Sequence, residues 1–245
     1  MGIHSLKIIL KGLMLNANST IRRAFEREPG LSQSLTKSRS KRRTASKEVR
    51  QGQLIKATIR SIARHGLSIT TIATVANEAG LSQGIINLHF QSKERLLEET
   101  LSHIVEEYRQ AWFKAYRESG DAAAEKLAAV AVVDFAKRIC QRNKLAVWFA
   151  FWGESRSRLT YRKIYEESSR EYKQLLVSLC EDIIKQGKYK VQARQVADGL
   201  LAINVGLWLE MLISPTEMSA EQAGETSLTY LQGVFPGHFS GHFSG

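Results

Sequence analysis

The side chains best suited to chemistry lie close together between residues 82 and 93, and they are hydrogen-bonding groups rather than nucleophiles. Gln83 and Asn87 each offer a donor and an acceptor, which matches the edge that adenine presents in the major groove of DNA. Gly84 leaves room for a DNA backbone or base, and Leu88 can touch a thymine methyl group. We therefore expect this segment to face double-stranded DNA. The candidate contacts are Thr70, Thr71, Ser82, Gln83, Gly84, Asn87, Leu88, His89 and Lys93.

Some of these candidates suit the phosphate backbone better than the bases. His89 and Lys93 carry donors for phosphate oxygens, and Thr70 or Thr71 stands at an expected helix start, where free N–H groups point outward. None of the outward positions between 82 and 89 is acidic, which suits a surface that meets phosphates. The alternative is a helix-turn-helix shape with no role at DNA, in which His89 is a core histidine.

Short helices are expected to position these residues. Apolar residues recur at helical spacing over Thr71–Ala79, a break follows at Gly80–Ser82, and a further helix reaches Phe90. An earlier stripe over Lys47–Arg64 completes a three-helix unit across residues 47–92, with the helix-turn-helix at 71–90. The turn lets the last helix stand out from the surface and enter a major groove.

The rest of the chain also reads as helical, so the fold class expected is all-α. Only three prolines occur, and helical patterns follow at 92–118, 122–141, 144–155, 158–187, 192–214 and 219–233. Residues 93–236 are expected to form one helical domain for effector binding and dimerisation. Residues 237–245 repeat a Gly-His-Phe-Ser unit and are expected to be a flexible tail.

Basic charge is concentrated at the N-terminus. The formal net charge is +11, and residues 1–47 contribute +9 of it, with eleven Lys/Arg against two Glu. This favours a polyanionic partner, either nucleic acid or an anionic membrane surface. Residues 1–46 are expected to be a disordered extension, whose run Lys37–Arg43 is either a solvated tail or an arm that reaches DNA. An adaptor for membranes or nucleic acid is the rival function.

Other chemistry has little support. The chain has no phosphate loop, nucleophile elbow, HExxH pair or metal-spaced Cys/His cluster, so we expect no enzyme, cofactor or metal. Cys140 and Cys180 stand among apolar residues and read as buried free thiols in a reducing cytosol. Without an uncharged apolar run of about 18 residues, we expect a cytoplasmic protein with no membrane partner.

An aromatic face points to a small-molecule site. Leu145, Trp148, Phe149 and Trp152 fall at i, i+3, i+4 and i+7 of one helix. Ring faces with a nearby carboxylate can hold a quaternary ammonium ion, although the same rings can simply be core. The effector candidates are Trp148, Phe151, Trp152, Trp208, Glu154 and Glu210, with Asp134 as another possible source of charge.

The segment Thr71–Leu97 resembles the TetR family of transcription regulators, within a resemblance that covers residues 48–100. The matching positions are Thr71, Ile72, Ala76, Ala79, Gly80, Ser82, Gly84, His89, Phe90, Lys93 and Leu96. Val75, Leu81 and Asn87 depart from the pattern, and Asn87 replaces an aromatic residue that often packs on a phosphate. The resemblance implies specific DNA binding.

Patterns at 82–86, 146–152, 159–161, 168–170 and 206–209 resemble the BetI-type branch of that family, over about residues 48–236. This implies a repressor of genes that convert choline to glycine betaine, released from DNA by choline or a related compound.

A second apolar stripe bears on oligomeric state. Its members are Val196, Leu200, Ile203, Leu207 and Met211. They either pack internally or form the four-helix dimer interface that the resemblance implies. A homodimer would place two recognition helices about 34 Å apart and require a near-palindromic operator. The helix over 92–118 links the two halves and is the expected lever for effector release.

Overall fold

The computed structural model describes residues 46–239, and every regular element in that range is a helix. Three helices form the first unit: α3 (Lys47–His65), α4 (Ile72–Ala79) and α5 (Gln83–Phe90). The second unit consists of α6 (Lys93–Glu118), α7 (Ala123–Val133), α8 (Arg142–Glu154), α9 (Leu159–Gly187), α10 (Ala193–Ile213), α11 (Ala220–Val234) and α12 (Pro236–Phe239). The all-α prediction is confirmed. The predicted N-terminal extension lies outside the described residues apart from Ser46.

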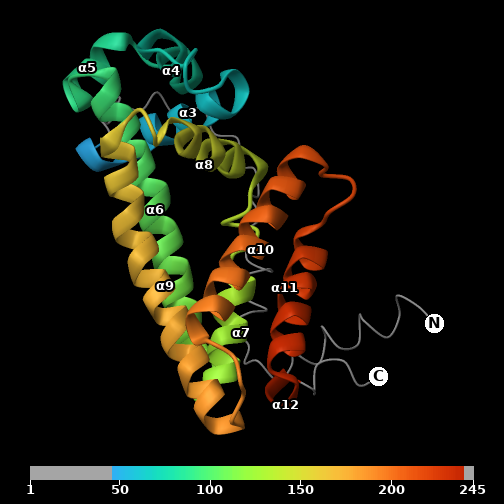
Figure 1. Cartoon of the computed structure of the whole chain (residues 1–245). Helices are drawn as coiled ribbons and strands as arrows, with labels where there is room; N and C mark the ends of the chain where they lie inside the picture. The colour runs from blue at the N-terminus through green and yellow to red at the C-terminus, as the bar shows by residue number, and fades with distance from the viewer. Residues whose placement is uncertain (1–45, 240–245) are drawn as a thin grey trace, which may run out of the picture.

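Figure 1 shows α3, α4 and α5 gathered at one end of the molecule, beyond the ends of the long helices α6 and α9. α8 runs between this end and the rest of the second unit, and α10 and α11 lie beside each other on the opposite side from α6 and α9. α6 therefore extends from the end that holds α3, α4 and α5 to the far end of the second unit.

Hydroxyl side chains start several of the helices. Ser46 accepts from Val49 N–H, Ser92 accepts from Arg95 N–H, and Thr71 and Ser219 each form a reciprocal capping box. Such caps satisfy backbone donors that have no partner inside the helix, and each contributes about 1 kcal/mol. The helix starts predicted near 47, 71, 92 and 219 follow from these residues.

Two apolar cores hold the molecule together. The first includes Leu54, Ile86, Leu96 and Trp148, so it joins the helix-turn-helix unit to α6 and α8. The second lies among α6, α7, α9, α10, α11 and α12, around residues such as Trp112. Because α6 and α8 carry residues of the first core, the two units share packed contacts as well as the chain itself.

The helix predicted over 122–141 is wrong in its second half, because α7 ends at Val133. Phe135 N–H donates to Val132 O and Ala136 N–H to Val133 O, both at 3.0 Å, so the chain tightens into turns. These turns bury the Asp134 carboxylate and the Phe135 ring. No glycine or proline marks the break, and the apolar spacing continues through it.

The tail predicted to be flexible from residue 237 is instead helical up to Phe239, whose side chain is buried. The Tyr189 hydroxyl accepts from Gly237 N–H at 2.9 Å and lies 3.0 Å from His238 Nδ1. Residues 235–239 therefore close the second core, and residues 240–245 lie outside the described part.

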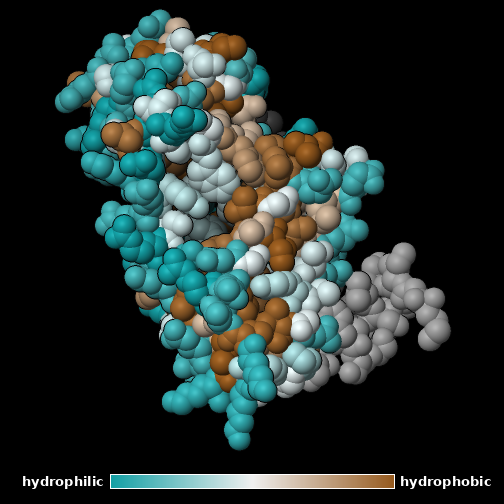
Figure 2. Space-filling model, in the orientation of Figure 1, coloured by the Kyte–Doolittle hydropathy of each residue, from teal (hydrophilic) through white to brown (hydrophobic). Residues whose placement is uncertain are grey.

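α10 exposes an unusual amount of apolar surface. By length and composition it could span a membrane, with a mean hydropathy of 1.6, although only 28% of that window is buried. Val205, Leu209 and Ile213 are 38%, 42% and 64% exposed, and hydrophobic side chains gather over α10 in Figure 2. Val196 and Leu200 of the predicted stripe are buried in the second core, so those two residues pack internally.

Candidate DNA interface and effector cavity

The turn between α4 and α5 fixes how α5 is presented. Gly80 has φ 64° and ψ 36°, a left-handed conformation that suits glycine, and its N–H donates to Asn77 O at 3.1 Å. Leu81 N–H donates to Ala76 O at 3.0 Å, which completes the end of α4. Ile86 and Phe90 are buried and anchor one face of α5 in the first core. The opposite face is left to solvent.

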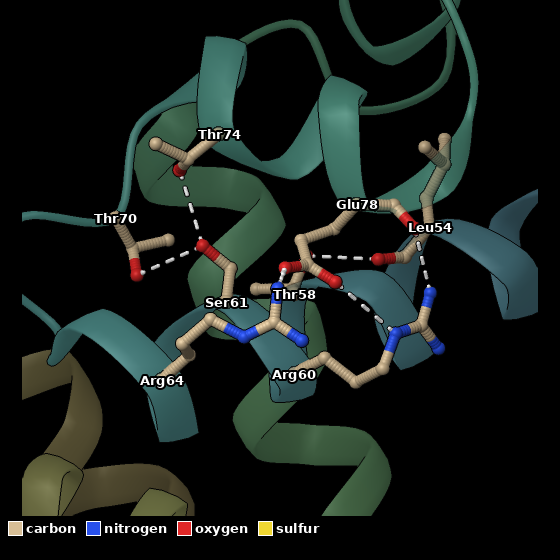
Figure 3. Close-up of polar contacts among 8 residues, drawn as sticks. All are labelled: Leu54, Thr58, Arg60, Ser61, Arg64, Thr70, Thr74 and Glu78. Carbon is tan, nitrogen blue, oxygen red and sulfur yellow. Dashed lines mark hydrogen bonds and ion pairs between the residues drawn. The ribbon is translucent and has the colours of Figure 1, made fainter.

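Polar contacts fix α4 on α3, as Figure 3 shows. The Glu78 carboxylate pairs with Arg64 Nη1 and, at 3.4 Å, with Arg60 Nε, and Arg60 Nη2 donates to the Glu78 carbonyl at 2.8 Å. Beneath them, the buried Ser61 hydroxyl contacts Thr74 Oγ1 at 3.1 Å and Thr70 Oγ1 at 3.4 Å. These contacts orient the helix-turn-helix on α3.

Most of the predicted DNA contacts lie on the free surface. Ser82, Gln83, Gly84, Asn87 and Leu88 are exposed at the start of α5 and one turn further along it, and Leu88 is 75% exposed. Their role at DNA stays a prediction.

The remaining candidates for DNA contact differ in how far their side chains are exposed. Thr71 is the exposed N-cap of α4, and His89 and Lys93 are half-buried. The prediction that Thr70 contacts DNA is wrong. Its side chain is 1% exposed, and its hydroxyl donates to Gly66 O at 2.8 Å. Its side chain belongs to the buried hydroxyl cluster and is not available to a phosphate. Sequence spacing could not separate Thr70 from Thr71, because either can cap a helix.

A cavity of about 50 Å³ lies between α6, α8, α9 and α10, and the empty space reaches about 510 Å³ when the solvent at its open mouth is included. Its lining residues are Val105, Tyr108, Asp134, Trp148, Trp152, Tyr165, Ser168, Ser169, Tyr172, Leu201, Asn204, Val205 and Trp208. The cavity therefore draws side chains from the long helices α6 and α9 and from α8 and α10, which supply its tryptophans.

Three indole rings form one wall of this cavity. Trp152 and Trp208 are nearly parallel, at 14° with ring centroids 6.3 Å apart. Trp148 lies 5.6 Å from Trp152 and 6.2 Å from Trp208 between centroids. Clustered indole faces present the negative side of the ring quadrupole, which attracts cations.

Asp134 supplies the only carboxylate among the lining residues, and it is 3% exposed. Its Oδ1 accepts from the Tyr108 hydroxyl at 2.8 Å and the Tyr172 hydroxyl at 3.3 Å. Its Oδ2 accepts from Asn204 Nδ2 at 2.8 Å. All three donors are neutral, and none of the lining residues is Lys, Arg or His.

Burial dominates the electrostatics of this carboxylate. Loss of solvation raises the pKa of Asp134 to about 6, although the hydrogen bonds from Asn204, Tyr108 and Tyr172 act in the opposite direction. Burial, and then the charge of Asp134, raise the pKa of Tyr108 and of Tyr172 well above the usual tyrosine value. A buried carboxylate with neutral donors only is costly, and a bound cation would offset that cost.

The predicted effector residues divide into two groups. Trp148, Trp152 and Trp208 line the cavity together. Phe151 is a correction, since it is 1% exposed and packs edge-on against Tyr161 outside the cavity lining, with ring centroids 4.9 Å apart. The prediction is also wrong for Glu154 and Glu210, because neither lines the cavity. Glu154 accepts a hydrogen bond from the Ser157 hydroxyl instead.

Sequence reasoning missed four lining residues that shape the site: Tyr108, Tyr165, Tyr172 and Asn204. Asn204 carried a signal, because it is the one amide in an apolar stretch of α10 and therefore needed a partner. The three tyrosines lie on α6 and α9 among charged residues and carried no such signal.

Two family models match this chain. Residues 54–100 match the model of bacterial regulatory proteins, tetR family. Residues 123–236 match the model of the BetI-type transcriptional repressor, C-terminal. A relative, the HTH-type transcriptional regulator BetI of Paraburkholderia xenovorans, is 33% identical over 188 residues, which are 77% of this chain and 94% of the relative.

Solved structures share the fold. A putative transcriptional regulator from Pseudomonas aeruginosa PAO1 is 26% identical with a TM-score of 0.70, and the match covers 80% of this chain and 95% of that one. A putative transcriptional regulator from Saccharomonospora viridis, solved in complex with choline, is 23% identical with a TM-score of 0.67, covering 76% and 97%. The chain thus belongs to the TetR family of DNA-binding transcription regulators and carries a BetI-type C-terminal domain.

Proposed function

We propose that this chain is a cytoplasmic, dimeric repressor that leaves its operator when a quaternary ammonium compound of the choline type occupies the cavity. One observation carries the choice of ligand: the buried Asp134 carboxylate has only neutral donors and stands beside three indole rings. A quaternary ammonium ion needs no hydrogen-bond acceptor, and both a ring face and an anion attract it. The choline complex of the Saccharomonospora viridis protein supports the same ligand class.

The reading surface in this proposal is the exposed face of α5. Gln83 and Asn87 pair with base edges, and Gly84 and Leu88 make close apolar contact. Thr71, Ser82, His89 and Lys93 hold phosphates and set the register. Asn87 stands where the family often has an aromatic residue that packs on a phosphate. In this chain a polar contact from Asn87 replaces that packing.

Dimerisation follows from α10 in this proposal. Val205, Leu209 and Ile213 share one face of the helix and stay exposed in the isolated chain. A second copy that covers this face would present two α5 helices to successive major grooves of a near-palindromic operator.

Release then requires a shift between two conformers. The ligand must bind more tightly to a conformer in which the two α5 helices are wrongly spaced than to the conformer that holds DNA. α6 is the element that moves, because it begins at Lys93, directly after α5, and carries Val105 and Tyr108 into the cavity wall.

A titration of the protein's tryptophan fluorescence tests the ligand class. Three of the four tryptophans line the cavity, so choline should change the emission at micromolar to millimolar concentration. The neutral isostere 3,3-dimethylbutanol should bind at least roughly tenfold more weakly, because it lacks the charge that Asp134 and the rings attract. Equal binding of both compounds, or of neither, would refute a cation site.

A further inference from the structure

The Tyr108 hydroxyl connects α6 to the carboxylate at the base of the cavity. Its oxygen lies 2.8 Å from Asp134 Oδ1, and α6 is the helix that follows the DNA-reading helix after only two residues. Ser92 N–H donates to Phe90 O at 2.7 Å, and Leu96 N–H donates to Ser92 O, so the junction is short and hydrogen-bonded. The two helices are therefore joined closely enough that a displacement of α6 would move α5.

Tyr108 also contacts the groups that would attract a bound cation. Its ring meets Trp148 and Trp208 edge-on, with centroid distances of 6.1 Å and 5.8 Å. It also meets the Tyr172 ring edge-on at 5.5 Å. The Tyr108 hydroxyl already donates to Asp134 and its ring already contacts two of the indoles, so an onium ion drawn to these groups competes with Tyr108 for both.

We infer that Tyr108 is the positioning residue that couples cavity occupancy to DNA release: the ligand competes with its hydroxyl for Asp134 and with its ring for the indoles, and so shifts α6. This inference rests on the proposed function. The Tyr172 hydroxyl lies 3.3 Å from the same Asp134 oxygen and 3.2 Å from Val130 O, to which it also donates. Tyr172 lies on α9, which is not continuous with the helix-turn-helix. Tyr172 therefore contributes to the electrostatics of the site without the link to α5.

The two tyrosines give a matched pair of variants. Tyr108→Phe and Tyr172→Phe each remove one hydroxyl from Asp134 Oδ1 and keep the ring. The quantity measured is the coupling factor, which is the ratio of the operator Kd at saturating choline to the operator Kd without choline. Both variants are expected to change the affinity for choline. Because the ratio is measured at saturating choline, it does not depend on that change.

The wild-type protein should show a coupling factor well above one. In Tyr108→Phe it should fall by roughly fivefold or more. In Tyr172→Phe it should stay within about twofold of wild type. An equal fall in both variants, or in neither, overturns the assignment of Tyr108 while leaving the proposed function in place. If choline neither binds nor releases the wild-type protein, the proposed function and this inference fall together.

Hydrogen exchange on the wild-type protein gives a second measurement that needs no variant. Saturating choline should change the protection of α6 amides around residues 104–111 more than that of α9 amides around residues 168–175. A larger change on α9 would contradict the inference even if Tyr108→Phe does not fold.

Discussion

The Trp208 indole N–H donates to the backbone carbonyl of Asp134 at 2.9 Å, so one wall of the cavity is fixed to the residue that supplies its charge. Trp208→Phe would keep an aromatic ring but lose this bond and the larger indole face. The dissociation constant for choline should rise by about tenfold, since a cation–π contact of this kind contributes about 1–2 kcal/mol. Isothermal titration calorimetry measures it.

Trp112 provides the matched control, because it is buried in the second core and is absent from the cavity lining. Trp112→Phe should leave choline affinity unchanged even where it lowers thermal stability. If both variants bind choline like the wild type, the indole wall has no part in recognition.

Choline affinity should depend on pH through Asp134. The pKa of this carboxyl is raised to about 6 in the free protein, so the group is protonated below that pH and ionised above it. A cation binds the ionised form, and binding must therefore release a proton when it occurs below about pH 6. Affinity should fall by about tenfold between pH 8 and pH 5, because roughly a tenth of the groups remain ionised at pH 5.

Asp134→Asn should bind choline weakly and lose this pH dependence, whereas Glu210→Gln, outside the cavity lining, should behave like the wild type. The same pH profile in wild type and Asp134→Asn would assign the effect to another group.

Asn87→Ala should weaken specific DNA binding by about 1–3 kcal/mol, because it removes a bidentate contact to one base. Binding to unrelated DNA should change little, since phosphate contacts dominate there. Electrophoretic mobility shifts at fixed salt, with operator and scrambled fragments, separate the two effects. The control is Asn143→Ala, which changes an exposed asparagine in the first turn of α8. An equal loss on both DNA fragments would remove Asn87 from base recognition.

Leu209→Asp should convert the dimer to a monomer, because it places a charge in the middle of the exposed α10 face. Sedimentation velocity at micromolar concentration measures the species present. Leu159→Asp changes another exposed leucine, 57% exposed at the start of α9, and should leave the dimer intact. A monomeric wild-type protein, or a dimeric Leu209→Asp protein, would place the interface elsewhere.

The sequence predicted the helix-turn-helix well because local signals agree there. Thr71 caps α4, Gly80 ends it, and Ile86 and Phe90 mark the buried face of α5. The cavity was predicted only in part. The spacing of Trp148 and Trp152 indicated a shared face, but nothing local shows that Asp134 leaves the helical path, or that Tyr108 and Tyr172 meet it from distant parts of the chain.

The errors have a common physical cause. Phe151 lies within the aromatic run and Glu154 follows it, yet their positions on the helix turn them away from the cavity, toward Tyr161 and Ser157. Val196 and Leu200 form a regular apolar stripe, and only tertiary packing decides that they face the second core while Leu209 faces outward. Periodicity identifies a face of a helix but not what covers it.

The central claim is that a cation in the Asp134 cavity releases the protein from DNA. The most direct test follows the complex between the wild-type protein and its own promoter fragment by fluorescence anisotropy while choline chloride is added. Sodium chloride replaces choline chloride in the control at equal ionic strength, because salt alone weakens DNA binding. We predict that choline dissociates the protein–DNA complex. Sodium chloride and 3,3-dimethylbutanol should cause no dissociation beyond the effect of salt. Identical curves for choline and sodium chloride would contradict the claim.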